Sequence, residues 1–141
     1  MKGVYFFALA VLICDCSSLA QDKFITVGTG GGFAGTSTVY KVTAKGEVFK
    51  GNGVGDIKFT LCGKIKRAKA KDIIAKVTDQ ARAASPFSHP GNLYYFIAST
   101  ENGNEQTVTW GDVDHPVSEE VKKVYDEVQA SVNSVEFKPI K

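Results

Sequence analysis

The chain is poor in the residues that most often build catalytic and metal sites. Among its 141 residues are three cysteines, two histidines, one tryptophan and one methionine. His89 and His115 are far apart in the sequence, and with Cys62 they form no recognisable zinc-binding pattern. No serine lies in the context of a nucleophile elbow, which argues against a serine-type triad. We therefore expect no catalytic residue, no metal ligand and no cofactor, and a protein that binds rather than catalyses.

Long apolar runs are also missing, except at the start of the chain. Lys2 supplies a positive charge, residues 4–13 form an uncharged apolar run, and small residues surround Leu19. This run of ten residues is too short to span a membrane, which takes about 20. Residues 1–20 therefore predict a secretory signal peptide, cleaved before Gln21, and a secreted or periplasmic product.

A lipoprotein is the alternative, in which Cys14 or Cys16 is acylated and the product is anchored in the cell envelope. Ile13 and Asp15 are poor neighbours for that reaction, which prefers a small residue before the cysteine. An uncleaved buried helix is a third possibility. We expect contact with a membrane only if one of the two cysteines carries a lipid.

Residues 21–141 predict a single domain that is stable without an internal disulfide. These 121 residues are enough for one hydrophobic core. After cleavage Cys62 has no cysteine partner, and its place in an alternating stretch favours a buried small hydrophobic residue over a nucleophile.

Hydrophobic periodicity predicts an α+β domain with the element order β-β-β-β-α-β-β-α. Alternating or β-branched stretches indicate strands at 24–27, 36–43, 47–50, 57–65, 93–98 and 106–110. The strand at 93–98 is the most apolar, which favours a central place in the sheet. Residues 70–84 have the spacing of a helix that ends at Ser85-Pro86. A final helix is indicated by one stripe of valines, with Pro116 in its first turn: Val117, Val121, Val124, Val128, Val132 and Val135. Both helices have a single apolar face, so we expect them to pack on one face of a mainly antiparallel sheet.

A glycine-dense loop is predicted at 28–35, followed directly by a strand. Gly30, Gly32 and Gly35 spell G-x-G-x-x-G, but no helix follows, so a nucleotide-binding loop is disfavoured. A wide hairpin loop with left-handed glycines explains the spacing. Phe33 at its centre either folds back onto the core, which we favour, or points outward as an anchor for a partner.

Charged residues are unevenly distributed. Residues 21–90 contain twelve basic and five acidic residues, and the basic ones are densest at Lys64, Lys66, Arg67, Lys69 and Lys71. A solvated face or an anionic partner explains this segment better than nucleic acid, because no aromatic residue interleaves it. We expect no nucleic-acid binding.

A short acidic turn precedes the final helix. Asp112 and Asp114 near His115 either bind a hard cation weakly or, as we favour, bend the chain. The neighbouring Trp110 is expected at the edge of the core rather than in a ligand platform.

The stretch Gly31-Gly32-Phe33-Ala34-Gly35 after a first strand resembles the opening signature of the emfourin family. A mid-chain helix, an aromatic hairpin ending in Trp110-Gly111-Asp112 and an apolar final helix fit the same pattern, over residues 24–132. The characterised behaviour of that bacterial family is inhibition of protealysin, a thermolysin-like zinc metallopeptidase. This chain differs from the characterised inhibitor of that family, because it has a predicted signal peptide and extra residues between Lys50 and Lys64.

The resemblance implies that residues 31–35 bind a protein partner, an extracytoplasmic metallopeptidase. Thermolysin-like enzymes favour bulky apolar side chains beside the scissile bond, so Phe33 would enter the cleft from a rigid loop. The alternative is a secreted or envelope-attached interaction module that inhibits nothing.

Overall fold

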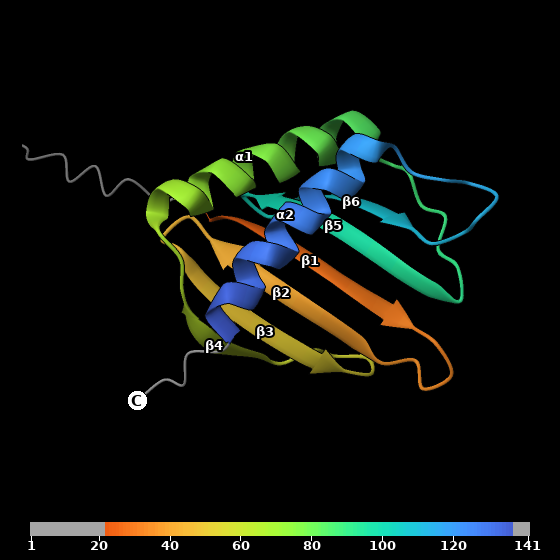
Figure 1. The fold of residues 1–141 in the computed structure, drawn as a ribbon, viewed down its shortest axis with the longest axis horizontal. Helices are drawn as coiled ribbons and strands as arrows, with labels where there is room; N and C mark the ends of the chain where they lie inside the picture. Colours follow the sequence, from red (N-terminus) through yellow and green to blue (C-terminus); the bar gives the residue numbers. More distant parts are fainter. Residues whose placement is uncertain (1–21, 137–141) are drawn as a thin grey trace, which may run out of the picture.

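The computed structural model describes residues 22–136, and the predicted signal peptide lies outside them. Six strands and two helices follow one another in the order predicted from the sequence (Figure 1). The elements are β1 (Lys23–Gly31), β2 (Ser37–Thr43), β3 (Glu47–Gly53), β4 (Phe59–Lys64), α1 (Arg67–Ala84), β5 (Leu93–Glu101), β6 (Asn104–Trp110) and α2 (Glu119–Glu136). No helix within residues 22–136 combines the length and the apolar character needed to cross a membrane.

The strands form one antiparallel sheet in the order β4-β3-β2-β1-β5-β6. Both helices lie on the same face of this sheet, as the single apolar stripes predicted (Figure 1). The strand predicted to be central, β5, is in the interior but second from the edge, because β1 and β2 occupy the middle. The fold is therefore α+β with two layers.

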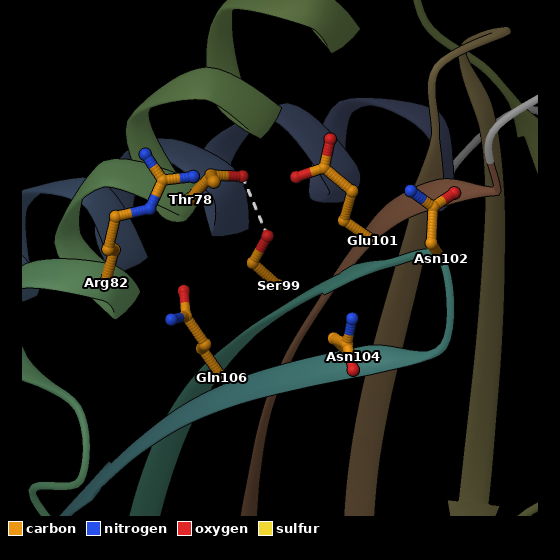
Figure 2. A pocket seen from close by; sticks show the side chains of 7 residues that line it. All are labelled: Thr78, Arg82, Ser99, Glu101, Asn102, Asn104 and Gln106. Atoms are coloured by element: carbon orange, nitrogen blue, oxygen red, sulfur yellow. Dashed lines mark hydrogen bonds between the residues drawn. The ribbon is translucent and has the colours of Figure 1, made fainter.

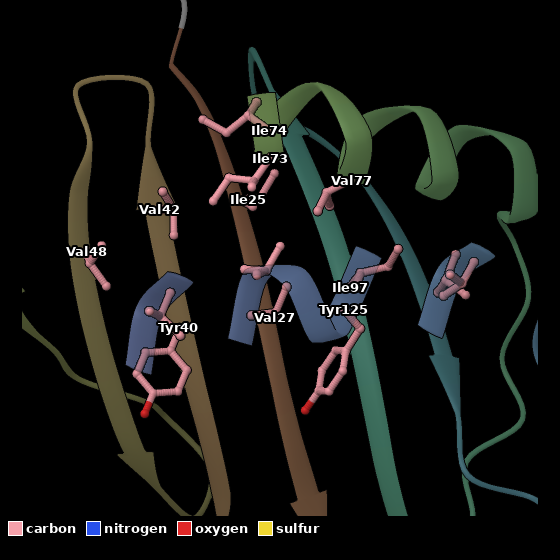
Figure 3. Packing of buried hydrophobic residues seen from close by; sticks show 14 of the residues in the cluster. Ile25, Val27, Tyr40, Val42, Val48, Ile73, Ile74, Val77, Ile97 and Tyr125 are labelled. Carbon is pink, nitrogen blue, oxygen red and sulfur yellow. The ribbon is translucent and has the colours of Figure 1, made fainter. Parts of the chain in front are cut away.

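The hydrophobic core fills the space between the sheet and the two helices (Figure 3). Ile25 and Val27 of β1 and Ile97 of β5 are fully buried on the side facing the helices. The predicted valine stripe of α2 is buried at Val121, Val128, Val132 and Val135, whereas Val124 is only partly buried. The predicted apolar face of α1 is likewise buried, at Ile73, Ile74, Val77 and Ala81.

The glycine-dense segment differs from its prediction. Residues 28–31 are not part of a loop, because β1 continues to Gly31. A Cβ added at Gly28 would come within 2.8 Å of the Phe96 ring, and one at Gly30 within 2.5 Å of the Tyr94 ring. Two aromatic rings of β5 therefore lie against the glycine backbone of β1, and the glycines serve close packing in a strand rather than a turn.

The predicted end of the third strand at Lys50 was also wrong. β3 runs through Gly51-Asn52-Gly53, where the sequence predicted a break after Lys50. Gly51 has Ile57 and Phe59 packed against it, again where a side chain would not fit. Tight turns lie at Gly46 and at Asn102-Gly103, with positive φ at all three residues.

The helix ends follow local hydrogen bonds. α1 begins at Arg67, three residues before its predicted start, and ends as predicted before Ser85-Pro86. α2 begins at Glu119, so Pro116 lies outside it and not in its first turn as predicted. Ser118 precedes the helix, and its Oγ accepts a hydrogen bond of 3.4 Å from the Val121 N–H.

Candidate functional site

Four connecting segments meet at one end of the sheet: residues 32–36, 54–58, 85–92 and 111–118 (Figure 1). The antiparallel register places them there, since Gly31 pairs with Leu93, Ser37 with Gly53, and Tyr95 with Trp110. We call this region the loop-rich end. It contains residues 32–35 of the predicted binding segment, and Gly31 ends β1 beside them.

The turn that carries Phe33 is tight and braced. The Gly35 N–H donates to the Gly32 carbonyl over 3.1 Å, which places Phe33 and Ala34 at the centre of the turn. The Gly32 N–H donates to the Asn92 carbonyl over 2.7 Å, which ties the turn to the start of β5. Gly31 has φ +93°, and a Cβ there would clash with the Asn92 carbonyl oxygen. Glycine is therefore required where the turn meets β5.

Phe33 is fully exposed, so the favoured prediction that it folds back onto the core was wrong. Phe33 lies at the centre of a four-residue turn, so its side chain cannot reach the core between the sheet and the helices. Of the large hydrophobic residues among 22–136, four are more than half exposed, and all four lie at the loop-rich end or border it: Phe33, Val54, Leu93 and Val113. We call this set the apolar rim. It spans β3 to β6, four strand spacings or roughly 20 Å.

A second group at the loop-rich end was not predicted. His89, Asp112 and His115 place their ligand-type atoms within 4.8 Å of one another. The two histidines are 26 positions apart in the sequence, yet their rings stack with centroids 4.2 Å apart. The sequence did contain a signal: His89 precedes β5 and Asp112 follows β6, and the outer ends of an antiparallel hairpin lie together.

The acidic turn bends the chain, as favoured. The Asp112 carboxylate accepts hydrogen bonds from the Asp114 N–H, over 3.0 Å, and is bonded to His115 Nδ1 over 2.8 Å. These bonds lower the pKa of Asp112 below its ordinary 3.8, and the bond from the Asp114 N–H contributes most. The carboxylate is therefore ionised at neutral pH.

A polar pocket of about 280 Å³ lies away from the loop-rich end, between α1 and the turn joining β5 to β6 (Figure 2). Thr78 and Ser99 meet there through a buried hydroxyl–hydroxyl bond of 2.7 Å. Figure 2 shows Arg82 and Glu101 as its charged groups, and Glu101 also approaches Lys23 at 3.9 Å. The lining contains neither histidine nor cysteine, and its two hydroxyls bond to each other.

Trp110 lies at the edge of the core, as predicted, and is 7% exposed. Its ring packs edge-on against Tyr125 and stacks on Tyr95, with centroids 5.3 and 6.0 Å away. Burial raises the pKa of Tyr125 to about 12. These rings pack α2 onto the sheet.

The basic segment follows the end of β4 into α1. Lys64, Lys66, Arg67 and Lys71 are exposed, whereas Lys69 pairs with Glu127 of α2. Cys62 in the edge strand β4 is only partly buried, less than predicted, and its thiol approaches the Thr60 carbonyl at 3.6 Å. Most of the segment is therefore a solvated face.

In comparisons with known proteins, the chain matches no protein-family model and no curated protein sequence.

Proposed function

We propose that this chain is an exported binding protein that inhibits a thermolysin-type zinc metallopeptidase by inserting the Phe33 turn into the substrate cleft. The observation that supports it is the full exposure of Phe33 on a braced turn. A large aromatic side chain held in water is costly for an isolated domain and useful to one that has a partner. The resemblance of residues 31–35 to the emfourin signature supplies the class of partner.

The turn is prepared for binding before the partner arrives. Its hydrogen bonds to Gly32 and Asn92 fix the backbone, so little conformational entropy is lost on association. Burying one phenylalanine side chain contributes about 1.5–3 kcal/mol, and the rest of the apolar rim can surround it and exclude water.

The same turn geometry explains resistance to cleavage. Peptides bound beside an enzyme strand are extended, whereas the Gly32–Gly35 bond closes residues 32–35 into a turn. Phe33 can therefore enter an apolar subsite while the adjacent peptide bonds stay out of register with the catalytic zinc of the peptidase.

Inhibition assays against several secreted thermolysin-type peptidases test the proposal. The purified protein should inhibit at least one of them, and Phe33→Ala should weaken inhibition about 30-fold, equivalent to about 2 kcal/mol. Leu61→Ala is the matched control, because Leu61 is also an exposed apolar side chain but lies in the middle of β4.

Two results would contradict the proposal. One is the absence of inhibition at micromolar protein across the panel, which would leave the chain as an interaction module without inhibitory activity. The other is inhibition that Phe33→Ala and Leu61→Ala weaken equally. Mass spectrometry of the recovered protein checks that it leaves the assay uncleaved.

A further inference from the structure

Two segments far apart in the chain are joined by backbone bonds at the loop-rich end. The His89 N–H donates to the Thr109 carbonyl, and the Asp112 N–H donates to the His89 carbonyl, each over 3.0 Å. The Thr109 N–H in turn donates to the Phe87 carbonyl over 3.1 Å. His89 is thereby fixed against the end of β6, and its ring faces the turn that contains Asp112 and His115.

The three side chains converge on one small region. The imidazole planes of His89 and His115 are nearly parallel, at 6°, with centroids 4.2 Å apart. Asp112 Oδ2 lies 2.8 Å from His115 Nδ1. Each residue offers one ligand-type atom, and these atoms lie within 4.8 Å of one another.

We propose that His89, Asp112 and His115 form a binding site for a late first-row divalent metal ion such as Zn²⁺. Two imidazoles and one carboxylate are a donor set that Zn²⁺ and its neighbours in the row accept, whereas Mg²⁺ and Ca²⁺ prefer oxygen ligands. Three protein ligands leave a fourth position of a tetrahedral site open to water or to a group from a partner.

The observed arrangement can close around an ion if one imidazole ring rotates, because the ring nitrogens donate in the ring plane and the two rings are now nearly parallel. Ligand atoms bound at zinc distances lie about 3.3 Å apart in a tetrahedral site, so a spread of up to 4.8 Å must contract by about 1.5 Å. His115 is the residue able to move, because its side chain is 54% exposed. His89 is held by its backbone bonds and by the edge of the Phe87 ring, with centroids 4.8 Å apart. The Asp112 carboxylate supplies a negatively charged oxygen ligand beside the two imidazole nitrogens.

The site lies between two connecting segments that meet at the loop-rich end. An ion bound there would join residues 85–92, which precede β5, to residues 111–118, which lead into α2. Asn92, which braces the Phe33 turn, belongs to the first of these segments. Metal binding would therefore stabilise the loop-rich end without requiring any movement of the core.

Isothermal titration with ZnCl₂ tests the site directly, without a peptidase. The protein is purified without a histidine tag and freed of metal with EDTA. We expect one ion bound per chain. In unfolding experiments, the ratio of folded to unfolded protein should rise about 100-fold when the free zinc concentration is about 100 times the Kd. His89→Ala and His115→Ala should each weaken binding at least about tenfold.

Asp114→Asn is the matched control, because Asp114 belongs to the same turn but is not among the three converging residues. It should leave the zinc affinity unchanged, whereas Asp112→Asn should lower it. Zinc bound with equal affinity by the His89→Ala/His115→Ala double variant would overturn the proposal, since that variant contains no histidine and still has Cys62.

Failure of the protein to bind zinc stoichiometrically would also overturn it. Circular dichroism in EDTA establishes that each variant folds. If a variant does not fold, NMR of the unaltered protein replaces it: the ring signals of both histidines should change together and saturate at one equivalent of zinc. Signals that stay unchanged refute the site.

Discussion

Gly28 lies in the middle of β1, where its backbone touches the ring of Phe96 from the neighbouring strand. Replacing it with alanine tests whether these glycines serve close packing rather than turn formation. A Cβ at this position would lie 2.5 Å from the Thr38 carbonyl oxygen and 2.8 Å from Phe96 Cε1. Both distances are well below van der Waals contact, so either the ring or β2 must shift.

The expected cost follows from which of these atoms can move. The Phe96 ring can tilt, but the Thr38 carbonyl belongs to the backbone of a paired strand. Overpacking of this kind lowers the free energy of unfolding by about 1–3 kcal/mol. Replacing a strand glycine with alanine raises it by about 0.5–1 kcal/mol, because alanine loses less conformational entropy on folding. Gly28→Ala should therefore destabilise the fold by about 1–2 kcal/mol and lower the Tm by about 4–8 °C.

Gly30→Ala is the matched control in the same strand. The atoms near a Cβ at Gly30 all belong to side chains, the Tyr94 ring and hydroxyl and the Ser37 hydroxyl. These two hydroxyls share a bond of 3.2 Å whose loss costs about 1 kcal/mol, partly offset by the gain from alanine. Urea unfolding of both variants gives the comparison. Gly28→Ala as stable as the parent, or less harmful than Gly30→Ala, would refute the packing argument.

Two further predictions concern pH. Hydrogen bonds from Lys69 and Lys76 lower the pKa of Glu127 below its ordinary 4.5. The ionised Glu127 therefore stabilises the folded state above about pH 4.5, and this contribution is lost as the pH falls through the pKa of the folded state. Glu127→Gln should flatten the acid side of the Tm profile, and an unchanged profile would contradict this. Burial raises the pKa of Tyr125 to about 12, so the folded state keeps a proton that the unfolded chain loses above its ordinary 10.0. Stability should fall as the pH rises above 10, and Tyr125→Phe should remove that part of the slope measured by urea unfolding.

The fold was predictable because its strongest signals are periodic. The α2 valines repeat at spacings of three and four along one face, and most of that stripe is buried. Asn102-Gly103 turns the chain between β5 and β6 with the left-handed angles that such pairs tolerate. Predictions of strand ends failed at Gly28 and Gly51, where the glycine backbone packs against a side chain from another strand or connection. The intrinsic strand propensity of a residue does not include such contacts with other segments, so it predicted that the strand ends at the glycine.

The candidate site was only half predictable. Residues 31–35 were proposed because they resemble the emfourin signature, but the direction of the Phe33 side chain depends on how tightly the turn closes, and sequence patterns do not predict this. Burial would have needed a loop long enough to fold back, and the Gly32–Gly35 bond makes it too short. The meeting of His89 with His115 depends on strand register, because β5 and β6 bring together residues that are 26 positions apart.

The two proposed sites could each lower the activity of a zinc peptidase, by different routes, and the inhibition assay must separate them. Phe33 would block the cleft while the enzyme keeps its metal. The His89, Asp112 and His115 site could instead lower activity by binding zinc released from the enzyme. Excess zinc in the assay restores activity only in the second case, because an occupied cleft stays occupied when the free metal is saturating. Inhibition that survives excess zinc and is lost in Phe33→Ala therefore assigns the effect to the turn. Inhibition that excess zinc abolishes assigns it to the histidine site and leaves Phe33 without a demonstrated partner.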